Sequence, residues 1–511
     1  MRREDEETPA KQNQEQTFVP AAQQLSRLFK LSAFEQCAGC LVLASLFLNF
    51  VRPQDLPGLT FVGSIRLPGL MSVLVIIVWL AKMNQGWTKP TKYMAVLLVF
   101  EGLRGIVGKY LDPGDVIVRN DYWQFQTWRD LLAQFLGLAF PIAVFFSRRI
   151  MINRLVASFN FIVFVLGLYA ITHAGRGPGG FLEDENDLCL VLVMFLPVAI
   201  LSISRAVSSA GRIAGMVAAV LAFAGIVATL SRGGFLGLVA VLAYLLLSSR
   251  RKMLAAGVMI VCAIAVMPLV SSRYWMEVES IQSDVSGGTG TVQQRIDMWK
   301  VAYAMWSDPR HIVFGVGLGN TPYWFRDYEP RERLLRERSL AGRAVHSLYF
   351  QLLPEMGLFG IFIVGNVIIG TLMLNRRAAG KARLLGETAQ SAVRELRLLS
   401  SGEAGSTADA RRQLEIAAVA SPAEREAISW MLHVLQKEAA LVESDLRMMN
   451  AAMLGVLTAG IGISVLYYPP LWVLAGTSAA MQNYWRALLY AARPLIVSFG
   501  ASPQSAGELR V

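Results

Sequence analysis

The sequence is poor in charged residues, histidine and cysteine. Asp, Glu, Lys and Arg make up 17% of its 511 residues, whereas they make up roughly a quarter of an average soluble domain. Of the four cysteines, Cys37 and Cys40 form a Cys-x-x-Cys pattern inside an apolar run, and no second pair completes a zinc or redox motif. The low charge indicates a membrane protein, and we interpret the cysteines as structural.

The sequence also shows no pattern typical of a secretory signal peptide. The first apolar run, 34–51, begins late and lacks a small-residue cleavage site. Residues 1–32 open with a polar stretch rich in Gln and Glu, which predicts a disordered cytoplasmic N-terminal tail.

Long apolar runs dominate the remainder. The mean hydropathy is +0.45 and hydrophobic residues reach 54%. A helix needs about 20 mostly apolar residues to cross a bilayer. Twelve segments approach that length: 33–51, 66–82, 93–109, 129–147, 152–172, 187–204, 211–230, 233–249, 253–271, 346–374, 449–467 and 470–490. The predicted fold class is an all-α integral membrane protein of about twelve transmembrane helices, with a large external helical loop and a cytoplasmic helical insert.

The distribution of Lys and Arg predicts the orientation, because these residues concentrate in the short cytoplasmic connections of membrane proteins. Every second connection is basic, which places both chain ends inside. The net charge of +11 follows largely from these loops, so no nucleic-acid partner is required. The predicted divisions are transmembrane helices 1–9 in 33–271, an external periplasmic loop in 272–345, helix 10 in 346–375, a cytoplasmic insert in 376–447, and helices 11–12 with the C-terminal tail in 448–511.

The two large non-membrane stretches are both predicted to contain helices. In the insert, Ser421-Pro-Ala-Glu424 is typical of a helix start, and the helix should continue into the eleventh span. The insert is either a solvated hairpin or a docking site for a partner. In the external loop, a helix should begin near Thr291, carry Trp299 and other aromatics on one face, and end near Asp308-Pro309.

The outer side carries more arginine than orientation signals require. Its planar donor fork matches phosphate oxygens in a two-pronged way, whereas ordinary loop charge is the competing interpretation for most of these residues. Arg232 stands out because it lies in a tight turn between two apolar runs and is followed by two glycines. The other outer cations are Arg52, Arg66, Lys109, Arg119, Arg129, Arg176, Arg295, Arg310, Arg326 and a run from Arg331 to Arg343.

Three further residues are candidates for chemistry. His346 opens the tenth span at its outer end, where it is either an interfacial anchor or a group that takes a proton from a sugar hydroxyl. Glu101 and Arg104 lie three residues apart within the third span. They form either a functional intramembrane pair or a structural ion pair, and the sequence leaves both open.

Three landmarks follow one another along the sequence: Leu-Ser-Arg-Gly-Gly at 230–234; Arg295-x-x-x-Trp299 with Phe-Gly-Val-Gly-Leu-Gly-Asn at 314–320; and His346-Ser-x-Tyr-x-x-Leu-x-x-Glu-x-Gly-Leu-x-Gly360. In this order and at this place in the membrane, they resemble the O-antigen ligase superfamily, which includes O-antigen polymerases. A fourth stretch, Glu183-Asp-Glu-Asn-Asp187, resembles one branch of it. The matched core covers roughly 180–375.

The resemblance implies a metal-independent, cofactor-free glycan transferase in the bacterial inner membrane, with its active site facing the periplasm. The donor would be a glycan on undecaprenyl diphosphate, and the acceptor lipid A-core, another glycan or a protein. Arg232 and Arg295 would hold the diphosphate, with His346 by the acceptor hydroxyl or the leaving phosphate, and Asn186 and Asn320 as further substrate-binding candidates. His173, Asp184 and Asp187 share an outer loop, so a metal is not excluded by the sequence.

Other functions compete with a ligase. A repeat-unit polymerase uses the same donor chemistry. A transporter or flippase of lipid-linked glycan predicts internal repeats and charged or broken helices near the midplane. The charge gathers instead at the outer mouth, apart from Glu101 and Arg104, and no repeat is evident. A scaffold acting through the insert is the remaining alternative.

Overall fold

The computed structural model describes residues 23–249 except 57, 60 and 112–118, a few positions between 252 and 264, and residues 291–330, 339–400 and 422–498. Every regular element in that part of the chain is a helix. This confirms the prediction of a helical membrane protein. Residues 1–22, almost all of the predicted ninth span, and 331–338 in the arginine-rich run lie outside the described residues, as do 401–421 of the insert.

The first half of the chain forms α2 (Ala33–Phe50), η1 (Pro53–Asp55), α3 (Phe61–Ser64), α4 (Leu67–Leu80), α5 (Lys89–Leu111), α6 (Asp121–Gln134), the π-helical turn η2 (Phe135–Ala139), α7 (Phe140–Phe145), α8 (Arg149–Thr172), η3 (Gly180–Leu182), α9 (Glu185–Arg205), α10 (Ser209–Ala228) and α11 (Arg232–Ser248). The second half forms α14 (Thr291–Trp306), α15 (Thr321–Tyr328), α17 (Leu348–Ser400), α19 (Pro422–Ala459) and α20 (Pro469–Ser498).

Six helical segments among the described residues are long and apolar enough to cross a membrane, and α4 and α11 are shorter apolar helices. The count of about twelve is therefore not supported and stays a prediction. The third predicted span coincides with α5, which carries Glu101 and Arg104. The eleventh, 449–467, runs past the end of α19 at Ala459. The six are Ala33–Asp55, Asp121–Phe145, Arg149–Thr172, Glu185–Arg205, Ser209–Ala228 and Leu348–Arg394.

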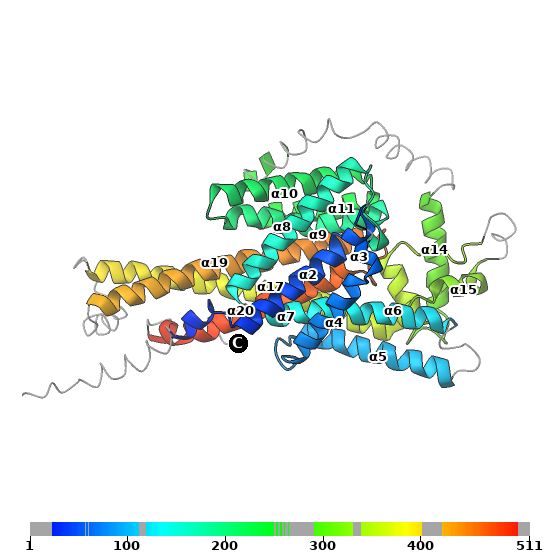
Figure 1. Cartoon of the computed structure of the whole chain (residues 1–511), viewed down its shortest axis with the longest axis horizontal. Coiled ribbons are helices and arrows are strands. Elements are labelled where there is room, and N and C mark those ends of the chain that lie inside the picture. Colours follow the sequence, from blue (N-terminus) through cyan, green and yellow to red (C-terminus); the bar gives the residue numbers. More distant parts are fainter. Residues whose placement is uncertain are drawn as a thin grey trace, which may run out of the picture.

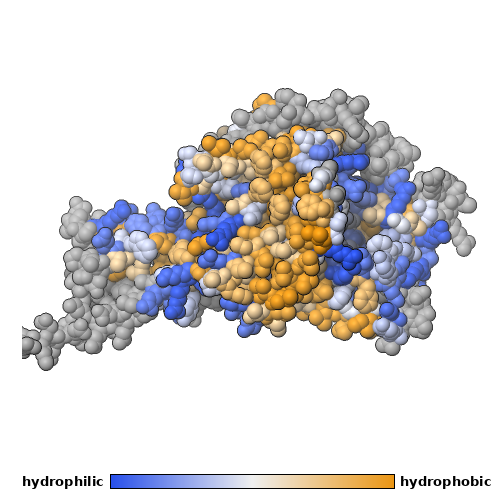
Figure 2. Space-filling view, in the orientation of Figure 1, coloured by the Kyte–Doolittle hydropathy of each residue, from blue (hydrophilic) through white to orange (hydrophobic). Residues whose placement is uncertain are grey.

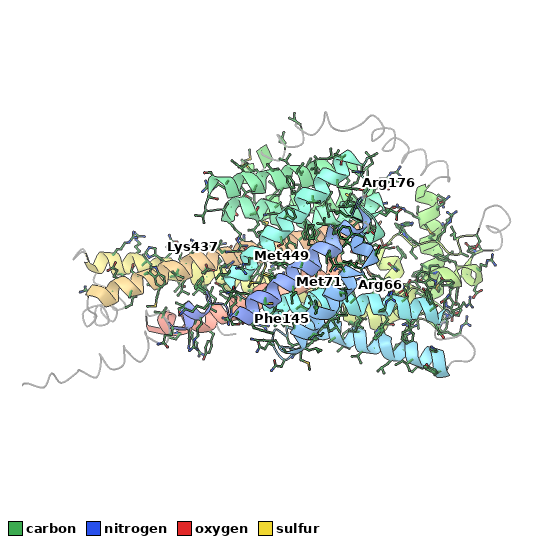
Figure 3. All side chains as sticks on the ribbon, in the orientation of Figure 1. Arg66, Met71, Phe145, Arg176, Lys437 and Met449 are labelled. Atoms are coloured by element: carbon green, nitrogen blue, oxygen red, sulfur yellow. The ribbon has the colours of Figure 1, made fainter. Side chains whose placement is uncertain are left out.

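The molecule is elongated, with α14 and α15 at one end and the paired extensions of α17 and α19 at the other (Figure 1). Apolar surface gathers between these ends, and hydrophilic surface flanks it on both sides (Figure 2). Arg66 and Arg176 lie toward the α14 end, Lys437 lies on the α17–α19 extension, and Met71 lies between them (Figure 3). The apolar band is the surface that a bilayer would cover.

The predicted insert is helical where it is described. Beyond its break at Gly357, α17 continues to Ser400, a length of roughly 65 Å at about 1.5 Å per residue, so it extends well beyond an apolar core of about 30 Å. α19 begins at Pro422 and continues without a break to Ala459, as predicted. The two helices pack along each other through small and branched residues, among them the buried Leu385, Leu435 and Ala439.

A buried ionic cluster ties the base of this hairpin to the remaining helices. Arg149 at the start of α8 contacts Glu438 at 2.6 Å and Asp445 at 2.9 Å, both on α19. Arg205 at the end of α9 contacts Asp445 at 3.1 Å. The hydroxyl of Tyr484 on α20 donates to Glu438 at 2.7 Å. Four helices therefore depend on one another's charges at this point.

The predicted external segment has a small core of its own. Met298, Val301 and Met305 of α14 pack with Trp324 and Phe325 of α15. α14 ends at Trp306, close to the predicted end at Asp308-Pro309. Only some of its aromatic residues are packed. The Trp299 ring stacks on Phe350 of α17 with centroids 5.0 Å apart, whereas Tyr303 is 54% exposed. Part of the predicted aromatic stripe thus covers the helix bundle.

Candidate active site

Arg232 is the first residue of α11, and its position is fixed by a chain of side-chain caps. Ser231 caps α11 by accepting from the Gly234 amide, and its hydroxyl donates to Asn186 at 2.7 Å. Asn186 in turn donates at 2.7 Å to Asp184, the N-cap of α9. The predicted substrate ligand Asn186 therefore links the beginnings of α9 and α11.

The two glycines after Arg232 let α11 approach its neighbours closely. A Cβ atom at Gly234 would lie 1.9 Å from the Sγ of Cys189 on α9. A Cβ atom at Gly233 would lie 3.0 Å from Cγ1 of Ile463. Larger residues would push the start of α11, and Arg232 with it, away from α9 and from the 460–468 connection.

Arg295 reaches the same place from α14. Its Nη1 donates to the carbonyl oxygen of Gly462 at 3.3 Å. A Cβ atom at Gly462 would lie 3.3 Å from that nitrogen and 3.9 Å from Cα of Gly233. The turn between α19 and α20 thus lies between Arg295 and the start of α11, where Arg232 is found.

His346 is held beside this turn by its sequence neighbours. The amide of Leu348 donates to the carbonyl oxygen of Gly460 at 2.8 Å. The indole of Trp299 donates to the carbonyl oxygen of Val345 at 3.1 Å. His346 itself has φ 50, a left-handed conformation that is uncommon outside glycine and is enriched in Asn, Asp and His. These contacts hold the backbone on both sides of His346 between α14 and the 460–468 connection.

Electrostatic effects link Arg295 with Arg232 and His346 with Arg295. Burial and the charge of Arg232 lower the pKa of the Arg295 guanidinium, while Asp184 acts in the opposite direction. Burial and the charge of Arg295 lower the pKa of the His346 imidazole below its usual value, while the charge of Asp184 acts to raise it. Two guanidinium groups thus repel each other at the site, next to an imidazole that favours its neutral form.

The glycine-rich turn at 314–320 has a structural role that its sequence did not indicate. α17 is broken at Gly357, where φ is 60 and ψ is −160. The amides of Val316 and Gly317 donate to the carbonyl oxygens of Pro354 and Glu355, at 2.7 Å and 3.0 Å. Backbone groups left open by the break are therefore satisfied by the turn.

Two glycines permit this docking. A Cβ atom at Gly315 would lie 2.4 Å from the carbonyl oxygen of Pro354, and one at Gly357 would lie 2.5 Å from that of Val313. Both residues also have positive φ. The Glu355 side chain adds a bond from the Gly319 amide at 3.0 Å and accepts from the hydroxyl of Tyr467. Two separate landmarks of the sequence are thus one packed unit.

Arg104 reinforces the same unit, which favours the structural interpretation of the Glu101–Arg104 pair. Its guanidinium donates to the carbonyl oxygens of Gly315 at 2.6 Å and Glu355 at 3.0 Å, and to that of Phe314. Its distance to the Glu101 carboxylate is 3.9 Å. Both side chains are buried. Arg104 therefore acts as a clamp across the helix break.

Asn320 also has internal partners. It is fully buried, its Oδ1 accepts from the Asn120 amide at 2.7 Å, and its Nδ2 donates to the Leu318 carbonyl oxygen at 3.0 Å. These contacts join the turn to the start of α6. A direct contact with substrate stays a prediction, and this burial does not favour it.

Several other arginines that the sequence places on the outer side have carboxylate partners, as expected for ordinary loop charge. Arg52 contacts Asp55 at 2.6 Å, Arg119 contacts Asp327 at 2.5 Å, and Arg310 contacts Asp308 at 2.7 Å. Within the described part of the chain, no three His, Cys, Asp or Glu side chains gather as metal ligands would.

The 460–468 connection is the element that sequence reasoning missed. Gly460 and Gly462 contact the segments that carry His346 and Arg295, yet the sequence placed both glycines inside the predicted eleventh span, 449–467, whereas α19 ends at Ala459. Their spacing offers no signal of this role, because the role depends on packing against residues more than 100 positions away.

Part of the chain is similar to a known protein family. Residues 217–365 match the family model described as O-antigen ligase. That segment contains Arg232, Arg295 and His346 and ends before the 460–468 connection. No curated protein sequence matches the chain.

Proposed function

Because the chain belongs to the O-antigen ligase superfamily, we propose that it is a membrane glycosyltransferase that moves a glycan from undecaprenyl diphosphate to an acceptor. The acceptor is lipid A-core, another glycan or a protein. The reaction takes place at the periplasmic face of the bacterial inner membrane, in a chain of about twelve spans with both ends in the cytoplasm.

The convergence of Arg232 and Arg295 carries the proposal. The two guanidinium groups belong to residues 63 positions apart in sequence, and the charge of Arg232 lowers the pKa of Arg295. A diphosphate between them would turn this repulsion into attraction. Guanidinium forks match its oxygens and stabilise the charge that develops as it leaves, so the chemistry proceeds without a metal.

His346 completes the reaction as the proton acceptor. The oxygen of the acceptor hydroxyl attacks the anomeric carbon of the donor, and the bond from that carbon to the diphosphate breaks. Undecaprenyl diphosphate leaves with the electron pair, and the hydroxyl proton passes to the imidazole. The lowered pKa of His346 keeps the ring neutral near pH 7, which suits a base better than a charged donor to phosphate.

A binding experiment tests the proposal directly. Purified wild-type protein in nanodiscs should bind undecaprenyl diphosphate in the presence of EDTA, and Arg232→Ala and Arg295→Ala should each weaken that binding. Arg129→Ala is the matched control, because Arg129 is an exposed outer arginine whose side chain is 63% accessible. Equal binding by all four proteins would contradict the assignment of the donor site.

The glycan profile of a deletion strain separates a ligase from a polymerase. A ligase predicts loss of long chains from lipid A-core, with lipid-linked polymer retained. A polymerase predicts accumulation of single lipid-linked repeats. Complementation with the Arg295→Ala gene should fail in either case, which ties the profile to the site.

A further inference from the structure

A cavity of about 330 Å³ lies next to the site of Arg232 and Arg295, here called the cationic site. α6, α15, α17, the segment before α17 and the 460–468 connection contribute to its walls. Small-molecule pockets range from about 300 to 1,000 Å³, so this cavity suits one small unit of a ligand rather than a whole chain. The proposed roles of Arg232, Arg295 and His346 leave it unassigned.

Aromatic side chains form much of the wall. Trp123 of α6 and Tyr323 of α15 line the cavity together with Tyr467 and Tyr468. Trp123 and Tyr323 remain 43% and 37% exposed. A pyranose ring presents an apolar face of C–H groups, and flat aromatic rings with a polar edge are well suited to pack against such a face.

Polar groups complete the lining. Glu355 is held by the Gly319 amide and by Tyr467. Oε1 of Gln351 and Oγ of Ser464 have no hydrogen-bond partner among the described residues. Buried polar atoms normally have a partner, and hydroxyl groups of a sugar would supply donors to both.

The charge of the lining distinguishes this cavity from a phosphate site. The described residues that line it include Glu355 but no Lys or Arg. Phosphate would meet no cation in it and would face a carboxyl group. A neutral or amino sugar fits these walls, whereas the diphosphate belongs at Arg232 and Arg295.

Two residues that line the cavity are close in sequence to residues of the cationic site. Val345 lines it and is followed by His346. Ser464 also lines it, two residues after Gly462, the acceptor of the Arg295 hydrogen bond. We propose that this cavity binds a sugar ring adjacent to the bond that is made or broken, in either the donor or the acceptor glycan. The inference rests on the proposed glycan transfer.

Two variants with opposite effects on the cavity provide the test. Trp123→Ala removes a wall, whereas Ala344→Trp adds bulk at an exposed lining residue. Tyr303→Ala is the control, because Tyr303 is an exposed aromatic of α14 that does not line the cavity. The probes are undecaprenyl diphosphate and the lipid-linked glycan that accumulates in a deletion strain, each titrated against protein in nanodiscs.

If the sugar belongs to the donor, the wild type and Tyr303→Ala bind the glycan-bearing lipid more tightly than the bare lipid. Both cavity variants then lose roughly three- to tenfold in affinity for the glycan-bearing lipid alone, the range expected for one aromatic contact. If the sugar belongs to the acceptor, donor binding is unchanged and the apparent KM for the acceptor rises by a similar factor.

Two results would overturn the inference, and they differ. If both cavity variants match the control in donor binding and acceptor KM while bare undecaprenyl diphosphate still binds, the sugar site is wrong and the proposed function stands. If the wild type binds neither lipid, the proposed function fails and the sugar site fails with it.

Discussion

Arg104 on α5 donates a hydrogen bond of 2.6 Å to the carbonyl oxygen of Gly315, 211 positions further along the chain. The same guanidinium reaches Glu355 at the break of α17. A charged residue within an apolar segment thus holds the backbone that leads to His346. The pair it forms with Glu101 is one part of a larger clamp.

The clamp predicts a stability defect for Arg104→Met. The substitution leaves three carbonyl oxygens without this donor and Glu101 without its cation, and breaking a buried ion pair costs about 3–5 kcal/mol. The measurement is thermal unfolding of the purified protein in detergent. Arg129→Met is the control, because Arg129 is exposed. An Arg104→Met protein as stable as this control but unable to bind donor would indicate a functional residue instead.

The ionic cluster at the base of the hairpin determines how the insert is tested. Removing all of 380–445 would delete Glu438 and Asp445 and leave Arg149 and Arg205 buried without their carboxylates. We therefore predict that replacing only 393–428 by a short Gly-Ser linker preserves glycan transfer. Asp445→Asn should instead lower the stability by about 3–5 kcal/mol, measured by thermal unfolding. Loss of transfer by a stable truncated protein would favour a scaffold role.

The sequence predicted those parts of the site that depend on local chemistry. Arg232 was recognisable because an arginine between two apolar runs needs a partner, and α14 because of its capping residues and aromatic spacing. The start of α19 at Pro422 followed from the preference of proline for the first helical turn.

Long-range packing could not be predicted in the same way. The glycines of 315–319 indicate no specific role in the sequence, yet the amides of Val316 and Gly317 in this turn donate hydrogen bonds to the broken α17. Asn320 has a similar structural role, because its side chain accepts a hydrogen bond from the Asn120 amide at the start of α6. Both roles arise from segments that meet only in the folded chain, so neither spacing nor composition reports them.

The orientation predicts which side of the membrane each end of the molecule faces. Lys437 lies on the α17–α19 extension and Tyr303 on α14, and both are exposed. In a cysteine-free background, an impermeant maleimide added to intact spheroplasts should label Tyr303→Cys but not Lys437→Cys. Labelling of both after permeabilisation shows that each thiol is accessible. The reverse pattern in intact cells would invert the topology.

Arg295→Lys should lose most of its activity although the charge is kept. Lysine is a point donor and does not reproduce the two-pronged contact with phosphate. The expected loss in transition-state stabilisation is about 1.5–3 kcal/mol, the range for hydrogen bonds to charged groups. Lys300→Arg on the same helix is the matched control, because the Lys300 side chain is 70% accessible. Steady-state transfer rates at equal protein concentration provide the measurement. Full activity of Arg295→Lys would show that charge alone suffices there.

The pH dependence of transfer should reveal the protonation state in which His346 works. Burial and Arg295 lower the pKa of the imidazole below its usual value, which is about 6.5. A base is active when deprotonated, so turnover should be flat near pH 7 and fall only as the pH drops through this lowered pKa. If His346 acts as a charged donor to phosphate, turnover should instead rise as the pH falls.

The variant His346→Asn separates these roles from a purely structural one. Asn tolerates the left-handed backbone at this position, where φ is 50, whereas alanine would add strain. General-base catalysis contributes roughly 10²–10⁴-fold, so turnover should fall by that factor, donor affinity should change little, and the acidic limb of the profile should disappear. Weaker donor binding with an unchanged acidic limb would assign His346 to the diphosphate. Turnover and donor affinity equal to the wild type at every pH would remove His346 from the chemistry.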